Sequence, residues 1–302
     1  MSALAEHQFE ILRSAEDSDG FVFGIGAEVS LDEDGFDPGE KNWLTQDSTN
    51  TRRGVVGFGR DLESAKTWAW ETHTDQEDVE SAVSILEQFE DIWTNEELAR
   101  VPGAVTAIRY RLAGRTRRIF GRPRRYAAPP TNLILNGLVP ISHDFQLVDA
   151  YTYDDVESVY EIPYSSSASG GGFTFPTTFP IVTEPSESNG AGQLAVGGTK
   201  RAYPVIRFNG PWIDPGFQTD DWTLSWKGSI PAAGWVEIDC RPWMLSVLNQ
   251  DGASVVGGLG RKSWLEDCFF APQTNPFVVL TGSATGGAAS ATVRWRNTWS
   301  SI

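Results

Sequence analysis

The residues with the clearest capacity for chemistry are arginines gathered in one short stretch. Residues 101–140 hold eight arginines and no acid, whereas residues 1–100 hold 24 acids and seven bases, so a stretch of charge +8 follows one of −17. An arginine guanidinium is a planar fork with five donors, which suits bidentate contacts with carboxylates. The pattern therefore indicates ion pairing within the chain or between copies of it, and we predict self-association. The arginine block consists of Arg109, Arg111, Arg115, Arg117, Arg118, Arg122, Arg124 and Arg125.

An acidic, turn-rich stretch over 31–40 supplies candidate partners for the arginine block. It resembles part of a calcium loop, but Phe36 falls at the fifth ligand position and Trp43 at the twelfth, where oxygen ligands are needed. A solvated acidic loop, or an acidic surface that meets arginines of a neighbouring copy, accounts for the stretch better. Exposed pairs contribute only ~0–1 kcal/mol each, so such a contact would set register and specificity more than affinity. The candidate acids at this oligomer interface are Asp32, Glu33, Asp34 and Asp37.

Other patterns that could carry catalysis or bind a cofactor are incomplete. Residues 257–263, GGLGRKS, resemble a phosphate loop, but Arg261 separates Gly260 from Lys262 and the stretch falls among predicted strands. The three histidines lie far apart in the sequence, which has no HExxH, CxxC or GxSxG motif. Carboxylates are plentiful but mark no specific pair for glycoside hydrolysis. We therefore predict a non-enzymatic protein with no catalytic residue, no cofactor and no metal site.

Composition and net charge narrow the range of possible partners and of cellular compartments. The net charge of −16 argues against general binding to nucleic acid or to anionic membranes, and no apolar run approaches the roughly 20 residues of a membrane-spanning helix. The first 20 residues are acidic and lack the apolar stretch of a secretory signal, so we expect synthesis in a cytosol. Two cysteines are too few for a disulfide framework, and whether Cys240 and Cys268 approach each other stays open.

Sequence periodicity in the first half of the chain predicts strands around a single helix. Residues 104–112 alternate in polarity and the chain returns through 115–126 after an Ala-Gly turn, which is typical of a hairpin that carries the arginine block. Apolar residues at helical spacing predict a helix over 79–93, with a capping box formed by Thr74 and Glu77. Further strands are expected at 21–29, 54–58, 67–73, 133–141 and 145–153.

The composition changes near residue 165, where a Gly/Ser-rich linker begins. Beyond it, roughly eight short strands between turn-rich segments predict an antiparallel β-sandwich. Eight of the twelve tryptophans follow residue 201, and filling of a sandwich core explains them better than stacking on sugars. Trp212 and Trp264 lie near predicted loops and are the candidate glycan or partner contacts. We thus predict a mainly β protein with one α-helix in its N-terminal domain, divided into domain 1–165, linker 166–171 and domain 172–302.

Several motifs occur in an order that resembles a known family. FGR at 58–60 and WAWE at 68–71 precede the stretch 101–126, in which GRPRR stands, and HDFQLVDAYTYDD follows at 143–155. The series then continues with FTFPTTFP, YPVIRFNGP, WVEIDCRP and ATVRWRNTWSSI, which ends at residue 302. This resembles the distal tail proteins of long, flexible-tailed bacteriophages, especially the minor tail proteins of phages that infect actinobacteria. The resemblance covers about residues 20–302.

The resemblance implies a structural protein of the virion tail tip. It implies an N-terminal belt domain that forms a ring, usually a hexamer, between the tail tube and the tail-tip hub and tape-measure proteins. The genome would pass through the lumen of this ring, without sequence-specific binding. A C-terminal galectin-like β-sandwich would project outward and offer attachment points for other tail proteins. The sequence departs from the family at Asp214-Pro215, where members often carry Asn-Pro, and in its first twenty residues.

A second interpretation of the C-terminal domain stays open alongside this one. Exposed tryptophans on a β-sandwich are also typical of a carbohydrate-binding module, which here would contact the host cell surface. A fold does not imply a function, so the galectin-like expectation by itself does not choose between sugar and protein partners. The sequence also leaves open the ring stoichiometry, the face that meets the tail tube and the host receptor.

Overall fold

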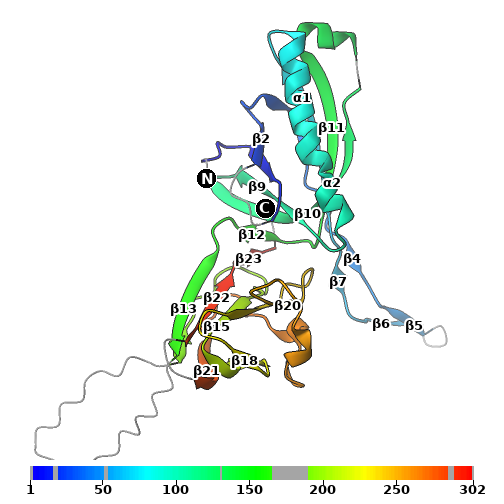
Figure 1. Ribbon diagram of the computed structural model, residues 1–302. Coiled ribbons are helices and arrows are strands. Elements are labelled where there is room, and N and C mark those ends of the chain that lie inside the picture. Colours follow the sequence, from blue (N-terminus) through cyan, green and yellow to red (C-terminus); the bar gives the residue numbers. More distant parts are fainter. Residues whose placement is uncertain are drawn as a thin grey trace, which may run out of the picture. The chain divides into compact units, whose positions relative to one another are not determined.

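The computed structural model describes residues 3–15, 20–50, 54–129, 131–164, 190–284 and 289–300. The chain divides into two units, the first made of Met1–Asp155 with Trp299–Ile302 and the second of Val156–Thr298 (Figure 1). The division lies earlier than the predicted end of the first domain at residue 165. The reason is that β13 (Ser158–Tyr164) pairs along its whole length with β22 (Ala289–Trp295) of the second unit. The predicted linker 166–171 and the FTFPTTFP motif lie outside the described residues.

The first unit is built on one antiparallel sheet with the strand order β2-β1-β9-β10-β11-β8-β3. The predicted hairpin is confirmed, because β9 and β10 pair through a turn in which Ala113 and Gly114 both have positive φ, as a tight hairpin turn requires. The sheet strands are β1 (Gln8–Leu12), β2 (Gly20–Gly24), β3 (Val29–Asp37), β8 (Thr67–Asp75), β9 (Thr106–Leu112), β10 (Arg115–Ala127) and β11 (Leu138–Leu147). In addition, β12 (Thr152–Asp154) pairs with β10, and β23 (Thr298–Trp299) pairs with β12.

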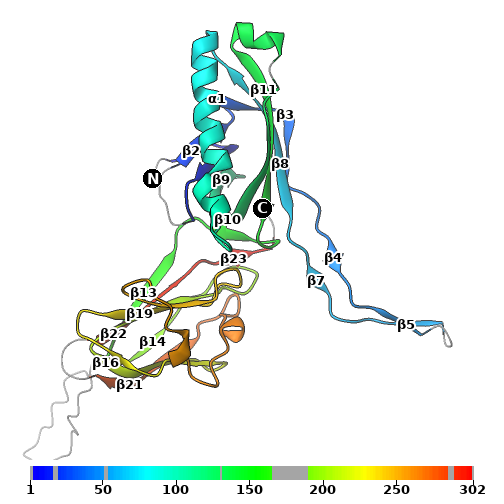
Figure 2. The ribbon, with the colours of Figure 1, turned by 45° about the vertical axis from the view of Figure 1, so that its right-hand side comes forward.

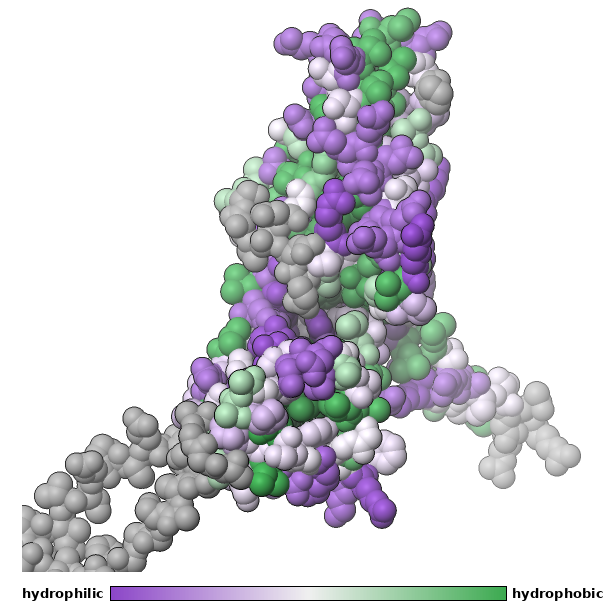
Figure 3. All heavy atoms as spheres, in the orientation of Figure 1, coloured by the Kyte–Doolittle hydropathy of each residue, from purple (hydrophilic) through white to green (hydrophobic). Residues whose placement is uncertain are grey.

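Helix α1 (Val79–Thr94) lies along this sheet and is the predicted helix (Figure 2). The predicted capping box is wrong. Asp78 is the N-cap and accepts a hydrogen bond of 2.8 Å from the backbone N–H of Ser81, because β8 runs on to Asp75 and keeps Thr74 within the strand. The outer side of α1 is hydrophilic, while apolar residues gather at the end of the unit where η1 (Asn132–Asn136) lies (Figure 3). A short helix, α2 (Glu96–Arg100), follows α1.

Aromatic rings fill the space between α1 and the sheet. His143 lies among them, fully buried, with its ring 4.3 Å from the ring of Trp93 and its Nε2 3.2 Å from Thr72 Oγ1. Burial lowers the pKa of His143 from its ordinary 6.5 to about 3, so the ring is neutral in the folded protein. The other large members of this core are Phe9, Phe23, Trp68, Trp70, Phe89 and Phe145.

The second unit is a sandwich of two antiparallel sheets, as predicted, with the orders β13-β22-β15-β19-β20 and β14-β21-β16-β17, and with β18 added to β16. Residues from both sheets, such as Ile206 and Phe217, share one core. Its remaining elements are β14 (Ala191–Gln193), β15 (Val205–Asn209), β16 (Trp212–Gln218), β17 (Thr223–Ser225), β18 (Ser229–Ile230), β19 (Trp235–Asp239), β20 (Ser246–Asn249), η2 (Val256–Gly258), η3 (Leu265–Asp267) and β21 (Phe277–Ala284). Within the described residues, no helix is long and apolar enough to cross a membrane.

The neutral state of His143 gives the first unit a predictable dependence on pH. Between about pH 6.5 and pH 3 the unfolded chain binds a proton at this position and the folded chain does not. The free energy of unfolding should therefore fall as the pH falls through this window, by at most ~1.4 kcal/mol per pH unit from this residue. Urea unfolding of the full chain at pH 7, 6, 5 and 4, followed by tryptophan fluorescence, measures the effect.

The matched comparison uses the exposed histidine of the same unit. His143→Gln should be less stable at pH 7 and should lose part of the pH dependence, whereas His7→Asn should keep all of it. A pH dependence that is the same in His143→Gln and in the unmodified chain would contradict this assignment.

Candidate functional site

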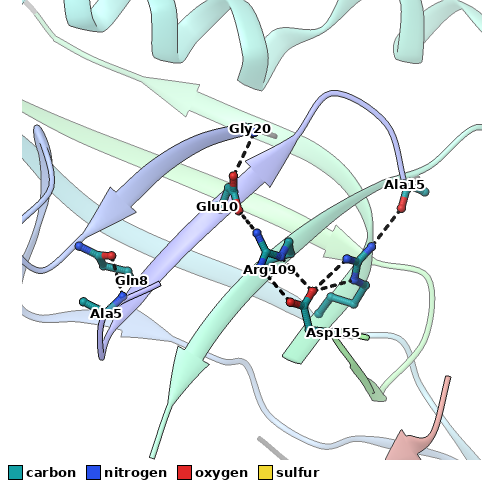
Figure 4. A network of polar contacts seen from close by, with 8 residues as sticks. Ala5, Gln8, Glu10, Ala15, Gly20, Arg109 and Asp155 are labelled. Atoms are coloured by element: carbon teal, nitrogen blue, oxygen red, sulfur yellow. Dashed lines mark hydrogen bonds and ion pairs between the residues drawn. The ribbon is translucent and has the colours of Figure 1, made fainter. Parts of the chain in front are cut away.

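Two guanidinium groups and two carboxylates form a buried network at the centre of the first sheet. Arg109 makes a bidentate contact with Asp155, Nε to Oδ1 and Nη2 to Oδ2, both at 2.9 Å, and Nη1 also pairs with Glu10 (Figure 4). Arg118 donates to Asp155 Oδ1 from Nη2 at 2.9 Å and from Nε at 3.2 Å, and to the backbone oxygen of Ala15 at 3.3 Å. The four charged groups balance in formal charge.

Burial and ion pairing act in opposite directions on this network. Removal from water disfavours the charged form of Asp155, but the hydrogen bonds and positive charges of Arg109 and Arg118 outweigh that effect and hold its pKa below the ordinary value. The hydrogen bond to Asp155 likewise raises the pKa of Arg109. Asp155 and Arg109 are therefore charged at neutral pH. Because burying ions is costly unless each is matched, this network stabilises one arrangement of the strands rather than offering a reactive group.

Arg117 is buried as well, on a different set of neighbours. Its guanidinium carbon lies 4.6 Å from the ring centre of Trp299, and its Nη1 donates to Thr152 Oγ1 at 3.4 Å. The indole N–H of Trp299 donates to Asp154 Oδ1 at 2.7 Å. These contacts hold Trp299 in the first unit.

The prediction that the whole arginine block faces a neighbouring copy therefore needs correction for three residues. Arg109, Arg117 and Arg118 are occupied inside their own chain, because β9 and β10 are covered on both faces at these positions. Two more are partly used within the chain: Arg111 lies 3.6 Å from Glu6, and Arg122 donates to the backbone oxygens of Val101 and Ala104.

Three arginines of the block remain available at the surface. Arg115, Arg124 and Arg125 are exposed, and the described part of the chain gives their guanidinium groups no carboxylate partner. Arg124 and Arg125 stand next to each other at a β-bulge in β10, where the register with β11 shifts. A bulge directs side chains away from the regular ladder. We call Arg124 and Arg125 the exposed arginine pair.

The four candidate acids lie in β3 rather than in a free loop. Asp32 pairs with His73 Nδ1, and Asp37 accepts a hydrogen bond of 2.8 Å from the backbone N–H of Gly39. Glu33 and Asp34 are exposed where β3 loses its regular register with β8, between Leu31 and Phe36. Among the described residues, no group of three or more His, Cys, Asp or Glu could hold a metal ion.

A projecting two-stranded arm is a feature that sequence reasoning missed. Two short ladders, β4 (Trp43–Leu44) with β7 (Leu62–Glu63) and β5 (Ser48–Asn50) with β6 (Val55–Gly57), carry it away from the sheet between β3 and β8 (Figure 2). Only the strand near 54–58 was predicted. The arm exposes large apolar side chains, of which Phe58 is 87% exposed. The exposed apolar residues of the arm are Trp43, Leu44, Val55, Val56, Phe58 and Leu62.

The two candidate tryptophans of the second unit have opposite environments. Trp212 is fully buried, with its ring stacked at 4.5 Å on Tyr164, so it offers no face to a sugar and that prediction is wrong. Trp264 is 69% exposed at the start of η3. Trp226 and Trp295 also fill the core, in line with the preferred interpretation of the tryptophans.

Two members of the buried network were absent from the predicted site. Glu10 is a single acid within the apolar strand QFEIL, and Asp155 ends the motif HDFQLVDAYTYDD. A charged residue inside an apolar strand signals a buried partner, but only the paired strands identify Arg109 as that partner.

The chain shares its fold with solved structures of phage tail and baseplate proteins. No protein-family model and no curated protein matches this sequence. Among solved structures, the chain is similar to the Dit protein of phage SPP1 (gp 19.1), which is described as a paradigm of the hub adsorption apparatus in phages infecting Gram-positive bacteria. The match covers 90% of this chain and 93% of that chain, with 13% identity and a TM-score of 0.53.

A chain of the phage P2 baseplate in its activated conformation is also similar. The match to the structure of that baseplate with Ca covers 98% of this chain and 99% of that chain, with 10% identity and a TM-score of 0.62. The match to the structure with Sr has a TM-score of 0.61. The resemblance inferred from the sequence motifs is therefore confirmed at the level of the fold.

The buried network can be tested through its central carboxylate. Asp155→Asn removes one of two negative charges and leaves two buried guanidinium groups undermatched. We expect the free energy of unfolding of the first unit to fall by about 3–5 kcal/mol. Denaturant unfolding of the full chain at pH 7 provides the measurement.

Glu77→Gln serves as the control, because Glu77 is exposed and has no ion pair among the described residues. It should change stability by at most about 0.5 kcal/mol. Equal stabilities of Asp155→Asn and Glu77→Gln would show that the network contributes nothing to the fold.

Proposed function

We propose that this chain is a structural, non-enzymatic protein of a phage tail tip. The observation that carries the proposal is the similarity of the whole chain, both units together, to a baseplate chain over 98% of its length. In this proposal, copies form a ring, a hexamer, that joins the tail tube of a long-tailed phage to the hub of the baseplate. The first unit is the ring-forming belt, and the galectin-like second unit presents surfaces to other tail proteins.

The surface of the first unit supports self-assembly. A closed ring needs two unlike patches on each copy, because each contact joins one patch to a different patch of the next copy. The exposed arm supplies an apolar patch, and the exposed arginine pair supplies a cationic one in a chain of net charge −16. Glu33, Asp34 and Asp37 are the exposed members of the candidate acidic partners. An acidic lumen would also limit adhesion of the passing genome.

Light scattering of the full-length chain tests ring formation. The expected particle has about six times the mass of the 33.2 kDa chain, so ~200 kDa. If arginine–carboxylate pairs contribute, the association should weaken between low and high salt. A mass of 33.2 kDa at every concentration would contradict autonomous ring formation.

One substitution tests the contribution of the arm to assembly separately from that of the rest of the surface. Phe58→Ser should leave the folded monomer within about 0.5 kcal/mol of its original stability, because the side chain is exposed, and should shift the particle towards monomer. Ile25→Ser, a comparable apolar-to-polar change at an exposed residue outside the arm, is the control. If both variants assemble alike, the arm is not part of the interface.

The exposed arginine pair has a matched counterpart in the second unit. Reversing both charges in the Arg124→Glu, Arg125→Glu variant should reduce the assembled mass at low salt. The same reversal at the neighbouring exposed residues Arg261 and Lys262 changes net charge equally and should leave assembly intact. Loss of assembly in both variants would point to net charge alone, and loss in neither would exclude the arginine pair.

The exposure of Trp264 favours one second candidate function, a carbohydrate-binding site on the host surface. An indole face that is open to solvent can stack on a sugar ring. Binding of the full chain to a glycan array, lost in Trp264→Ala and retained in Phe277→Ala, would support it. Phe277 is an exposed aromatic residue of the same unit. A glycan array without a bound sugar would remove this function.

A further inference from the structure

The only two cysteines of the chain lie in the same core. Cys240 follows β19 and Cys268 follows η3. Both are free cysteines without a disulfide, and both are almost completely buried among the apolar residues of the second unit. Buried cysteines often act simply as small apolar side chains. Here, however, two occur together in a chain that otherwise uses none.

Backbone hydrogen bonds bring the two cysteines to one place. The N–H of Cys240 donates to the backbone oxygen of Pro204 at 3.1 Å. Two residues earlier, Ala202 exchanges two backbone hydrogen bonds with Phe270, at 3.0 and 2.8 Å. The segment 202–204 therefore contacts both the end of β19, where Cys240 lies, and the residues after η3. Cys268 lies two positions before Phe270 in the latter segment.

The two thiols interact within this core. The side-chain hydrogen bond with Cys268, together with burial, raises the pKa of the Cys240 thiol well above its ordinary value. Cys268 Sγ lies 3.3 Å from the backbone oxygen of Trp264, to which it donates. The Cys240 thiol is therefore protonated at neutral pH and slow to react, since the thiolate is the nucleophile in thiol chemistry.

We propose that Cys240 and Cys268 form an intramolecular disulfide when the protein meets a small-molecule disulfide such as oxidised glutathione. The thiolate of one cysteine attacks the small disulfide, which releases one small thiolate and leaves a mixed disulfide on the protein. The second thiolate attacks the protein sulfur of the mixed disulfide and releases the second small thiolate. The two protons from the cysteines pass to the two released thiolates, and the small disulfide is the oxidant.

The bond would close a loop over residues 241–267, which includes β20, η2 and η3 (orange in Figure 1). A crosslink of this kind stabilises a fold mainly because it restricts the unfolded chain. It would also anchor the segment that presents Trp264, since the crosslinked Cys268 lies four residues beyond it. The inference concerns the second unit alone and does not depend on ring formation.

Oxidation of the native full-length chain tests the proposal. The chain is incubated with oxidised glutathione at pH 8, unfolded in denaturant with N-ethylmaleimide, and weighed by mass spectrometry. We expect a mass lower by about 2 Da with no maleimide added, and a peptide in which Cys240 is linked to Cys268. The midpoint of thermal unfolding of the second unit should rise by roughly 4 °C or more, and dithiothreitol should reverse the shift.

Single substitutions and an unfolded sample complete the experiment. Cys240→Ser and Cys268→Ser should each end as a mixed disulfide or a single maleimide adduct, without a change in midpoint. Two maleimide groups on the native chain, under conditions that oxidise the urea-unfolded chain, would overturn the proposal. So would disulfide bonds found only between chains. Both of these outcomes are measured on the unmodified protein, so they decide the proposal even if a serine variant fails to fold.

Discussion

The first unit depends on the matching of two buried guanidinium groups by two buried carboxylates. Arg109 stands directly opposite Glu10 in the β1–β9 ladder and directly opposite Arg118 in the β9–β10 ladder. Asp155, at the end of β12, accepts from both arginines. A slip of one residue in any of these ladders would turn a charged side chain to the other face and leave a buried ion without its partner. The network therefore holds the β1–β9 and β9–β10 ladders in one register.

That constraint also divides the arginine block by role. The arginines in the middle of β9 and β10 are neutralised inside the sheet and contribute to the fold. The exposed arginine pair lies beyond them at the bulge, where regular pairing ends and the side chains face solvent. One stretch of sequence thus serves the interior of the unit and, in the proposed ring, its contact with a neighbour. The arm adds an apolar surface that is exposed among the described residues of its unit, and exposed apolar patches of this kind are typical of interaction surfaces.

The core of the second unit consists of aromatic and aliphatic side chains from both of its sheets. Trp212, Trp226 and Trp295 are buried in the sandwich, which leaves Trp264 as the exposed indole of the two candidate contacts. The segment after β20 that carries this residue has little regular secondary structure, and backbone hydrogen bonds with Ser225, Lys227 and Ala202 attach it to the rest of the unit. The surface proposed to contact a partner is thereby attached to the sandwich core.

The sequence by itself determined the elements whose signal is local. The hairpin, the helix over 79–93, the strand over 67–73 and the β-rich second half all follow from periodicity and turn residues within about 15 neighbours. Only the tertiary structure decided which arginines are buried, because alternation predicts one covered face and β9 and β10 are covered on both. It likewise decided the N-cap, since β8 continues past Thr74, and the division between units, since β13 pairs with a strand more than a hundred residues away. The arm and the cysteine pair belong to the same group: exposure and proximity depend on which distant segments are packed nearby, and a single segment of sequence does not contain that information.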